Sequence, residues 1–260
     1  MDILVLLKQV PATDSVVSIA DDGKSIATED LSWVINPYDE FAVEEALRIK
    51  ETHGGSVTIL CVGKEKTTEA IRTALAMGAD KGILINDNKA RTSDSLRTAK
   101  ILAGALKDIS HDVIITGQRA VDYEGFQVGP AVAELLGIPN ISMVINQEIV
   151  DGTIKCQRTV EGGVIVTKAP LPVLITTQRG LNDPRYASLP GIMKAKKKPI
   201  ETKSIEDVGI DPLELDKIGV RVEAMTLPPE RKAGKIIDME TDQAKAAELV
   251  RALHEEAKVI

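Results

Sequence analysis

Residues 113–130 read VIITGQRAVDYEGFQVGP, and this stretch decides the fold class. Val113 to Thr116 is a short apolar run rich in β-branched residues, which predicts a buried strand. A glycine-punctuated loop follows and leads into a predicted helix from about Gln127 to Leu136, which ends at Gly137. A buried strand, a loop and a helix in this order are typical of an α/β fold with a parallel sheet.

The same alternation fills the chain on the N-terminal side of this stretch. Apolar runs predict strands at Ile3–Leu7, Val57–Val62 and Ile83–Ile85. Helical spacing predicts helices that begin at Asn36-Pro37, at Thr67 and at Ser93, the last capped by Ser93 or Thr92. Strands and helices of these lengths imply right-handed crossovers and one parallel sheet. Hydrophobic residues make up 43% of the chain and aromatic residues only 2%, so we expect a core of Val, Ile, Leu and Ala.

The pattern changes after Pro139. Strand-like runs at 141–150, 153–158 and 164–167 are joined by glycine turns, and a run at 173–176 closes the predicted globular part. Residues 180–211 show little periodicity and contain a lysine run that ends at Lys198. We therefore divide the chain into an α/β domain (1–178), a loop and linker (179–211) and a C-terminal arm (212–260) that ends in a helix over 241–258. A long arm of this kind is expected to pack on a partner subunit.

Composition and charge argue against several classes of function. The net charge of −7 disfavours nucleic acid as a partner, because binding to phosphates requires a basic surface. No apolar run is long enough to span a membrane, and the N-terminus has no export signal, so we expect a cytoplasmic protein. Cys61 and Cys156 lack the spacing of a metal site and are predicted to be core residues.

Side chains that could carry out catalysis do not form a recognisable set. The acidic residues Asp39, Glu40, Glu44 and Glu45 are interpreted as the solvated start of a helix. We find no nucleophile beside a base, no metal cluster and no acid–base pair. We therefore predict that the chain is not a self-contained enzyme.

A binding site is expected where the parallel strands end, because ligands of open α/β sheets bind outside the carboxyl ends of the strands. The residues that follow the predicted strands are Lys8-Gln9, Val62-Gly63, Asn86-Asp87 and 117–129. The last segment enters a helix, whose first N–H groups and dipole favour an anion. It matches neither the dinucleotide-binding fingerprint nor a P-loop, and an ordinary loop between strand and helix stays open as an alternative.

Four segments together resemble the beta subunit of electron transfer flavoproteins. They are NPYDEFAVEEA (36–46), RTALAMGAD (72–80), the loop 117–129 and LNDPRYASLPGIMKAKKK (181–198). The resemblance covers nearly the whole chain. It implies an adenine nucleotide alpha hydrolase-like domain and a heterodimer whose alpha subunit binds the working FAD.

The resemblance also implies a second nucleotide in the beta subunit, which is AMP in most members and a second FAD in a bifurcating branch. The expected contacts are Leu6, Asn36, Pro37, Tyr38, Asp39, Val62, Gly117, Gln118, Arg119, Ala120, Val121, Asp122, Tyr123, Glu124, Gly125, Phe126, Gln127 and Val128, with the phosphate near 125–128. The QVGP sequence at 127–130 resembles the bifurcating branch. The bulky Tyr123 resembles the AMP type, which we favour.

The segment 179–198 is similar to the family's recognition loop, which docks acyl-CoA or related flavin dehydrogenases. The expected docking residues are Tyr186, Leu189, Pro190, Ile192, Met193 and Lys194, with Leu189 as the apolar plug. A quinone oxidoreductase or a similar protein is the expected acceptor. A stand-alone adenine-nucleotide sensor and an enzyme for an adenylated substrate remain as alternatives, and the aperiodic arm disfavours both.

Overall fold

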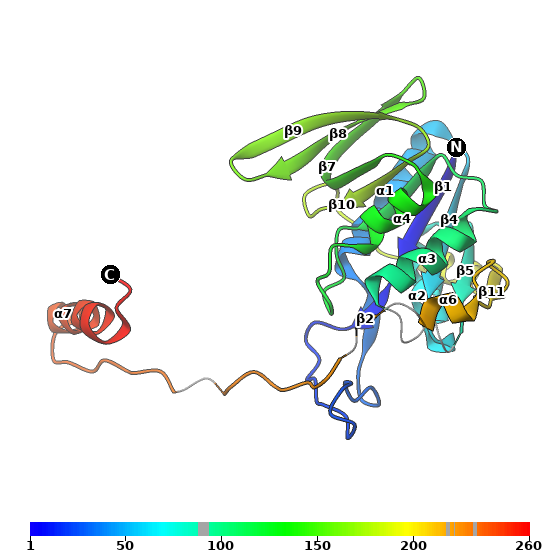
Figure 1. Ribbon diagram of the computed structural model, residues 1–260. Coiled ribbons are helices and arrows are strands. Elements are labelled where there is room, and N and C mark those ends of the chain that lie inside the picture. The colour runs from blue at the N-terminus through cyan, green and yellow to red at the C-terminus, as the bar shows by residue number, and fades with distance from the viewer. Residues whose placement is uncertain (88–93, 217–218, 221, 231–232) are drawn as a thin grey trace.

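The computed structural model describes residues 1–260 except 88–93, 217–218, 221 and 231–232. Its strands are β1 (Asp2–Leu7), β2 (Gln9–Pro11), β3 (Trp33–Ile35), β4 (Ser56–Val62), β5 (Lys81–Ile85), β6 (Val113–Gly117), β7 (Asn140–Val150), β8 (Thr153–Val160), β9 (Gly163–Pro170), β10 (Val173–Thr177) and β11 (Ile200–Lys203). Nine of them form one sheet in the order β11-β5-β4-β1-β6-β10-β7-β8-β9, and β2 pairs with β3 in a small separate ribbon (Figure 1).

The sheet is parallel from β11 to β7, and β7, β8 and β9 continue it as an antiparallel meander. Strand β1 lies in the middle, with β4 on one side and β6 on the other. The chain builds β4 and β5 outward from β1 and then returns to form β6 on the opposite side. Such a reversal opens a crevice at the carboxyl ends of the strands. The predicted α/β fold class with a parallel sheet is confirmed.

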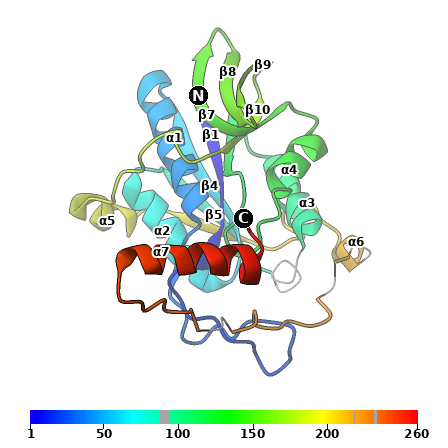
Figure 2. The same ribbon diagram turned by 90° about the vertical axis from the view of Figure 1, so that its left-hand side faces the viewer.

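Helices cover both faces of the parallel sheet (Figure 2). Helices α1 (Pro37–His53) and α2 (Thr68–Met77) pack on the face that receives Ile3 and Val5 of β1. Helices α3 (Ser95–Leu106) and α4 (Val128–Leu136) pack on the face that receives Leu4 and Leu6. Successive side chains of a strand point to opposite faces, so the uninterrupted apolar run of β1 supplies both halves of the core.

The expected helix starts are mostly confirmed. Asn36 is the N-cap of α1, and Pro37 stands at its first position. The start of α3 differs from the prediction: the helix begins at Ser95, and the carboxylate of Asp94 caps it by accepting a hydrogen bond from the backbone N–H of Arg97. The predicted caps Thr92 and Ser93 lie outside the described residues.

The segment 179–211 is more regular than its sequence pattern predicted. It contains helix α5 (Leu189–Ala195) and strand β11, which pairs with β5 at the edge of the main sheet. The sheet therefore extends beyond the run at 173–176, with which the globular part was expected to close. The two elements have seven and four residues, which is too short for a periodic signal, and their positions depend on packing against α2 and β5.

The C-terminal arm leaves the sheet after helix α6 (Pro212–Asp216). Its last helix, α7 (Asp242–Arg251), lies within the predicted range 241–258, is capped by Thr241 and continues as a π-helical segment, Ala252–Ala257. No described residue of these two segments is buried, and Figure 1 shows them apart from the α/β body at the end of an extended stretch. Packing of the arm on a partner subunit, and the division of the chain at 178 and 211, stay predictions.

Two further expectations concern the core and the membrane. Cys61 and Cys156 are buried free thiols, and burial raises the pKa of each to about 12. No helix in the described part of the chain is both long and apolar enough to cross a membrane.

Candidate functional site

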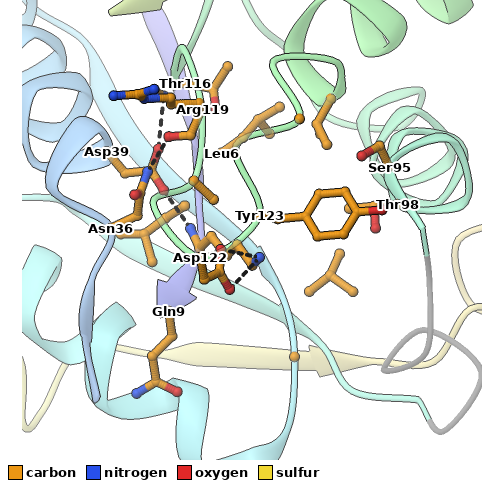
Figure 3. Close-up of a pocket in the computed structure, with 18 of the residues that line it drawn as sticks. Leu6, Gln9, Asn36, Asp39, Ser95, Thr98, Thr116, Arg119, Asp122 and Tyr123 are labelled. Carbon is orange, nitrogen blue, oxygen red and sulfur yellow. Dashed lines mark hydrogen bonds and ion pairs between the residues drawn. The ribbon is translucent and has the colours of Figure 1, made fainter. Parts of the chain in front are cut away.

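A cavity of about 570 Å³ opens at the carboxyl ends of β1, β4 and β6 (Figure 3). The loop 117–127 and the start of α4 form one wall, and the start of α3 forms the opposite wall. Val220 and Val222, from the stretch that follows α6, contribute to its rim. Its volume lies in the range of about 300–1,000 Å³ that is usual for small-molecule sites. The cavity lies outside the carboxyl ends of the parallel strands, where the sequence predicted a binding site, and at the point where the strand order reverses.

Most of the predicted nucleotide contacts line this cavity. They are Leu6, Asn36, Asp39, Val62, Gly117, Gln118, Arg119, Ala120, Asp122, Tyr123, Gly125, Phe126, Gln127 and Val128. The remaining four, Pro37, Tyr38, Val121 and Glu124, do not line it. These four belong to the same two segments, and Tyr38, Val121 and Glu124 help to shape the loop, as described below.

Other residues of the wall were not among the predicted contacts. Lys8, Gln9 and Gly63 follow β1 and β4, and the rule that ligands bind at strand ends had already singled them out. The remaining ones are Leu7, Thr28, Trp33, Lys64, Lys66, Thr67, Asp94, Ser95, Thr98, Leu102, Thr116, Gly129, Val220 and Val222. Residues of α3, together with Val220 and Val222, reach the cavity only through tertiary packing, so no local pattern could have identified them.

Asn36 fixes the loop 117–127 to the start of α1. Its Nδ2 donates to the carbonyl of Arg119 at 2.9 Å, and its Oδ1 accepts the N–H of Val121 at 3.1 Å. The side chain makes no capping hydrogen bond to α1, although it occupies the capping position. Because the amide is buried, both of its polar atoms are used to hold the loop in one conformation.

Arg119 holds together the strained part of the loop. Its guanidinium carbon lies 5.1 Å from the ring centre of Tyr38 and 5.2 Å from that of Phe126, which is close enough for cation–π attraction to both. It also donates to the Tyr38 hydroxyl at 3.0 Å and pairs with Glu124 at 3.1 Å. Glu124 and Phe126 have φ angles of 52° and 54°, a left-handed conformation that costs about 1–2 kcal/mol in a residue other than glycine. Strain of this kind is characteristic of ligand-binding loops.

Asp39 joins the ends of β1 and β6 beneath the cavity. Its carboxylate accepts the backbone N–H groups of Lys8 at 2.8 Å and of Gly117 at 2.9 Å. Burial raises its pKa to about 7, and these N–H groups offset part of that rise. A side chain at position 117 would collide with the Asp39 carboxylate and with Tyr38, so glycine is required there.

The acidic residues at the start of α1 are mostly buried, which corrects the prediction of a solvated turn. Asp39, Glu44 and Glu45 are buried, and Glu40 is half-buried. Besides the local pair of Glu44 with Arg48, distant segments supply partners: Glu44 pairs with Arg185, and Glu45 accepts the side-chain amide of Asn182. The local sequence does not contain these partners, so the pattern alone indicated solvent.

The start of α4 lies on the cavity wall, where helix physics predicts an anion site, and this site stays a prediction. Gly129 lets the helix lie against the sheet, because a Cβ there would stand 2.9 Å from the methyl groups of Thr116 and Thr176. The first N–H groups of α4 and the positive end of its dipole favour a negative ligand. On the cavity wall, Oε1 of Gln118 is buried without a hydrogen-bond partner, and buried acceptors of this kind normally have one.

The cavity wall also includes lysine residues. Lys8, Lys64 and Lys66 line it in a chain whose net charge is −7. The Nζ of Lys8 lies 2.8 Å from the carboxylate of Asp122, and this ion pair connects the end of β1 to the loop. No group of three His, Cys, Asp or Glu side chains able to hold a metal ion occurs in the part of the chain that the structure describes. The wall thus combines apolar side chains, basic side chains and the start of a helix.

The predicted docking residues form a separate surface on and beside α5. All six of Tyr186, Leu189, Pro190, Ile192, Met193 and Lys194 are exposed, and none lines the cavity. Leu189 is 80% exposed, as expected of a plug, but it is the first residue of a helix rather than part of an aperiodic loop. Lys198, the last lysine of the run, donates from Nζ to the carbonyls of Leu75 and Ala79 and therefore has a structural role.

Comparisons with known proteins agree with this arrangement. The family model of the electron transfer flavoprotein domain matches residues 24–208 of this chain. The electron transfer flavoprotein subunit beta of Bacillus subtilis is 43% identical over the full length of both chains. The protein of the same name from Bradyrhizobium diazoefficiens is 40% identical, again over both full lengths. That of Thermoanaerobacterium thermosaccharolyticum is 38% identical over 91% of this chain and 92% of the relative.

Proposed function

The chain belongs to the electron transfer flavoprotein family as a beta subunit, and from this premise we propose that it binds AMP as a structural ligand and docks flavin dehydrogenases. The membership makes it one subunit of an electron carrier, with an alpha subunit as its partner, rather than a self-contained enzyme. In the proposal, FAD is held mainly by the alpha subunit, and electrons reach it from acyl-CoA or related dehydrogenases. A quinone oxidoreductase or a similar protein accepts them.

The cavity at the ends of β1, β4 and β6 is the observation that carries the nucleotide proposal. Its loop is pinned by Asn36 and Arg119, so the backbone of 125–128 is fixed before a ligand arrives. The phosphate of AMP is proposed to lie against this backbone and the start of α4. Leu6 and Val62 offer apolar contact to the base or the ribose, and Oε1 of Gln118 can accept a hydrogen bond from either.

Tyr123 supports AMP over a longer nucleotide. Its ring extends from the loop toward Ser95 and Thr98 on α3 (Figure 3). It lines both the main cavity and a neighbouring cavity of about 140 Å³, which is bounded also by Leu96, Gln127 and Val220. The Tyr123 side chain is thus shared by the linings of the two cavities, and we infer that it limits passage from one to the other. A mononucleotide needs only the main cavity, whereas a dinucleotide has to continue past Tyr123.

A second FAD in place of AMP is the alternative, as in a bifurcating electron transfer flavoprotein. The neighbouring cavity favours it, because rotation of one tyrosine side chain would join the two spaces. The sequence at 127–130, QVGP, points the same way. We retain AMP as the proposed ligand because the bulky Tyr123 side chain lines both cavities.

Docking is proposed to use the exposed apolar residues of α5 and its N-terminal flank. Tyr186, Leu189 and Met193 are 98%, 80% and 72% exposed. Large apolar side chains that are this exposed and this close together are typical of protein-binding surfaces. The C-terminal arm (212–260) is proposed to pack on the alpha subunit, which would cover the exposed apolar residues of α7, such as Leu249 and Val250.

Titration of the heterodimer after its nucleotides have been removed tests the nucleotide proposal. Calorimetry with AMP should show one site per heterodimer, and FAD added afterwards should fill only the site of the alpha subunit. If FAD fills two sites and AMP does not compete for either, the chain is instead a beta subunit of the bifurcating type, which holds a second FAD. If neither ligand binds to the beta subunit, the nucleotide proposal fails altogether.

A further inference from the structure

We propose that α5 is clamped to the α/β body at both ends, so that its exposed apolar residues are presented to a partner in one fixed conformation. Arg185 and Arg72 are the positioning residues of the two clamps. The inference rests on the proposed docking role of α5 and assigns residues that make no contact with the docking partner. It predicts that affinity for the dehydrogenase depends on side chains that lie outside the docking surface itself.

The first clamp lies just before α5 and centres on Arg185. Its guanidinium donates to Glu44 from Nε at 2.8 Å and from Nη2 at 3.0 Å, and to Glu51 at 2.5 Å and 3.2 Å. Its backbone N–H also donates to Glu44 at 3.1 Å. The Glu44 side chain is only 3% exposed, so the pair is shielded from water on the carboxylate side. Bidentate pairs of arginine and carboxylate fix geometry as well as contributing energy.

Asn182, which precedes Arg185 in the chain, strengthens this clamp. Its Nδ2 donates to Oε2 of Glu45 at 2.8 Å and to the carbonyl of Phe41 at 3.1 Å. The other oxygen of Glu45 accepts a hydrogen bond from Gln147 at 2.7 Å. The chain that leads into α5 is therefore tied to α1 at two points, through Glu44 and Glu45.

The second clamp lies at the end of α5 and involves α2. Nη1 of Arg72 donates to the carbonyls of Ala195 and Lys198, each at 2.6 Å. Lys198 in turn donates to carbonyls at the end of α2, including that of Leu75 at 3.1 Å. Between the clamps α5 touches α2 directly, since a side chain at Gly191 would collide with the carbonyl of Ala76.

These contacts matter because α5 has too few residues to be stable by itself. A helix of seven residues is well below the length at which helices form in isolation. Only Ala195 of α5 is buried, so little apolar packing holds it. Without the clamps, α5 and its exposed apolar residues would have to become ordered when the partner binds. The free energy of that ordering would be subtracted from the binding free energy.

The test compares four heterodimers with the wild type in steady-state electron transfer from an acyl-CoA dehydrogenase. Arg185→Gln releases the first clamp and Arg72→Gln releases the second. Arg48→Gln is the matched control, because it removes another cation from the same carboxylate, 2.8 Å from Glu44, without touching the segment before α5. Leu189→Ala reports on docking itself. FAD and AMP contents are measured for all of them.

Each clamp variant should raise the KM for the dehydrogenase about tenfold with an unchanged kcat, as expected for a lost preorganisation. Hydrogen exchange of the α5 amides should accelerate in these variants, while that of α1 and the nucleotide contents stay as in the wild type. The Arg48→Gln control should leave both KM and exchange unchanged. If one clamp variant fails to assemble, the other carries the test, since they act at opposite ends of α5.

The possible failures can be told apart. If Leu189→Ala raises KM while both clamp variants leave KM and α5 exchange unchanged, the clamp inference is wrong and docking stands. If Leu189→Ala leaves KM unchanged, the docking role fails, and the inference that depends on it fails too. If KM rises as much for Arg48→Gln as for Arg185→Gln, the effect comes from the loss of any cation beside Glu44 and not from release of the segment before α5. That result would overturn the clamp inference.

Discussion

Replacing Gly129 by valine should separate α4 from the sheet and weaken nucleotide binding. A Cβ at this position would lie 2.9 Å from the methyl groups of Thr116 and Thr176 and 3.5 Å from a methyl group of Leu174. Valine adds two further methyl groups at the same place, so the start of α4 must move away from β6 and β10. Overpacking of this kind costs about 1–3 kcal/mol of stability.

The displacement also acts on the proposed phosphate site, because the N–H groups at the start of α4 move with the helix. A hydrogen bond to a charged group contributes about 1.5–3 kcal/mol. Loss of one such bond therefore corresponds to AMP affinity that is about ten- to a hundredfold weaker. The assembly with the alpha subunit should also become less stable to heat, since a ligand stabilises only the folded form.

Calorimetric titration with AMP and the melting temperature of the heterodimer measure both effects. Gly163→Val is the matched control: it lies in β9 away from the cavity, and no atom stands within 4 Å of the position that its Cβ would take. The control should bind AMP as the wild type does. Wild-type AMP affinity in Gly129→Val would refute the placement of the phosphate at the start of α4.

Three further predictions follow from the site and the docking surface. Burial raises the pKa of Asp39 from 3.8 to about 7, so between these values the folded protein keeps a proton that the unfolded chain has released. The stability that this proton contributes is complete below pH 3.8 and is lost as the pH rises through 7. The melting temperature of the heterodimer should therefore fall from pH 5 to pH 8. An equal fall of the melting temperature with pH in Asp39→Asn would contradict this. Tyr123→Ala should join the two cavities and let FAD compete with AMP in a titration, and continued selection of AMP by the same factor would show that Tyr123 does not limit ligand size. Leu189→Ala should lower kcat/KM for the dehydrogenase about ten- to a hundredfold, since burial of one leucine contributes about 1.5–3 kcal/mol, with intact FAD; unchanged transfer would disprove its role as a plug.

The parts of the fold that the sequence predicted are those with a local signal. The apolar runs of β1, β4 and β6 and the Asn36-Pro37 start of α1 are each visible in a few neighbouring residues. Because parallel strands end at one edge of a sheet, these local signals also located the cavity. The individual contacts at 117–128 came from the family resemblance rather than from spacing.

The features that the sequence did not predict depend on distant partners. Asp39 can be buried because the N–H groups of Lys8 and Gly117 donate to its carboxylate, and Glu44 can be buried because Arg185 reaches it from a segment 141 residues away. Helix α5 and strand β11 owe their positions to α2 and β5, and their sequences are too short to show a period. The wall formed by α3 likewise exists only in the folded sheet.

The nucleotides released from the purified heterodimer test the central proposal most directly. The protein is denatured, and the released compounds are identified by mass and counted against the protein. One FAD and one AMP per heterodimer is the result predicted here. Two FAD per heterodimer, together with NADH-dependent reduction of a low-potential acceptor, would contradict the assignment of AMP to the cavity at the ends of β1, β4 and β6.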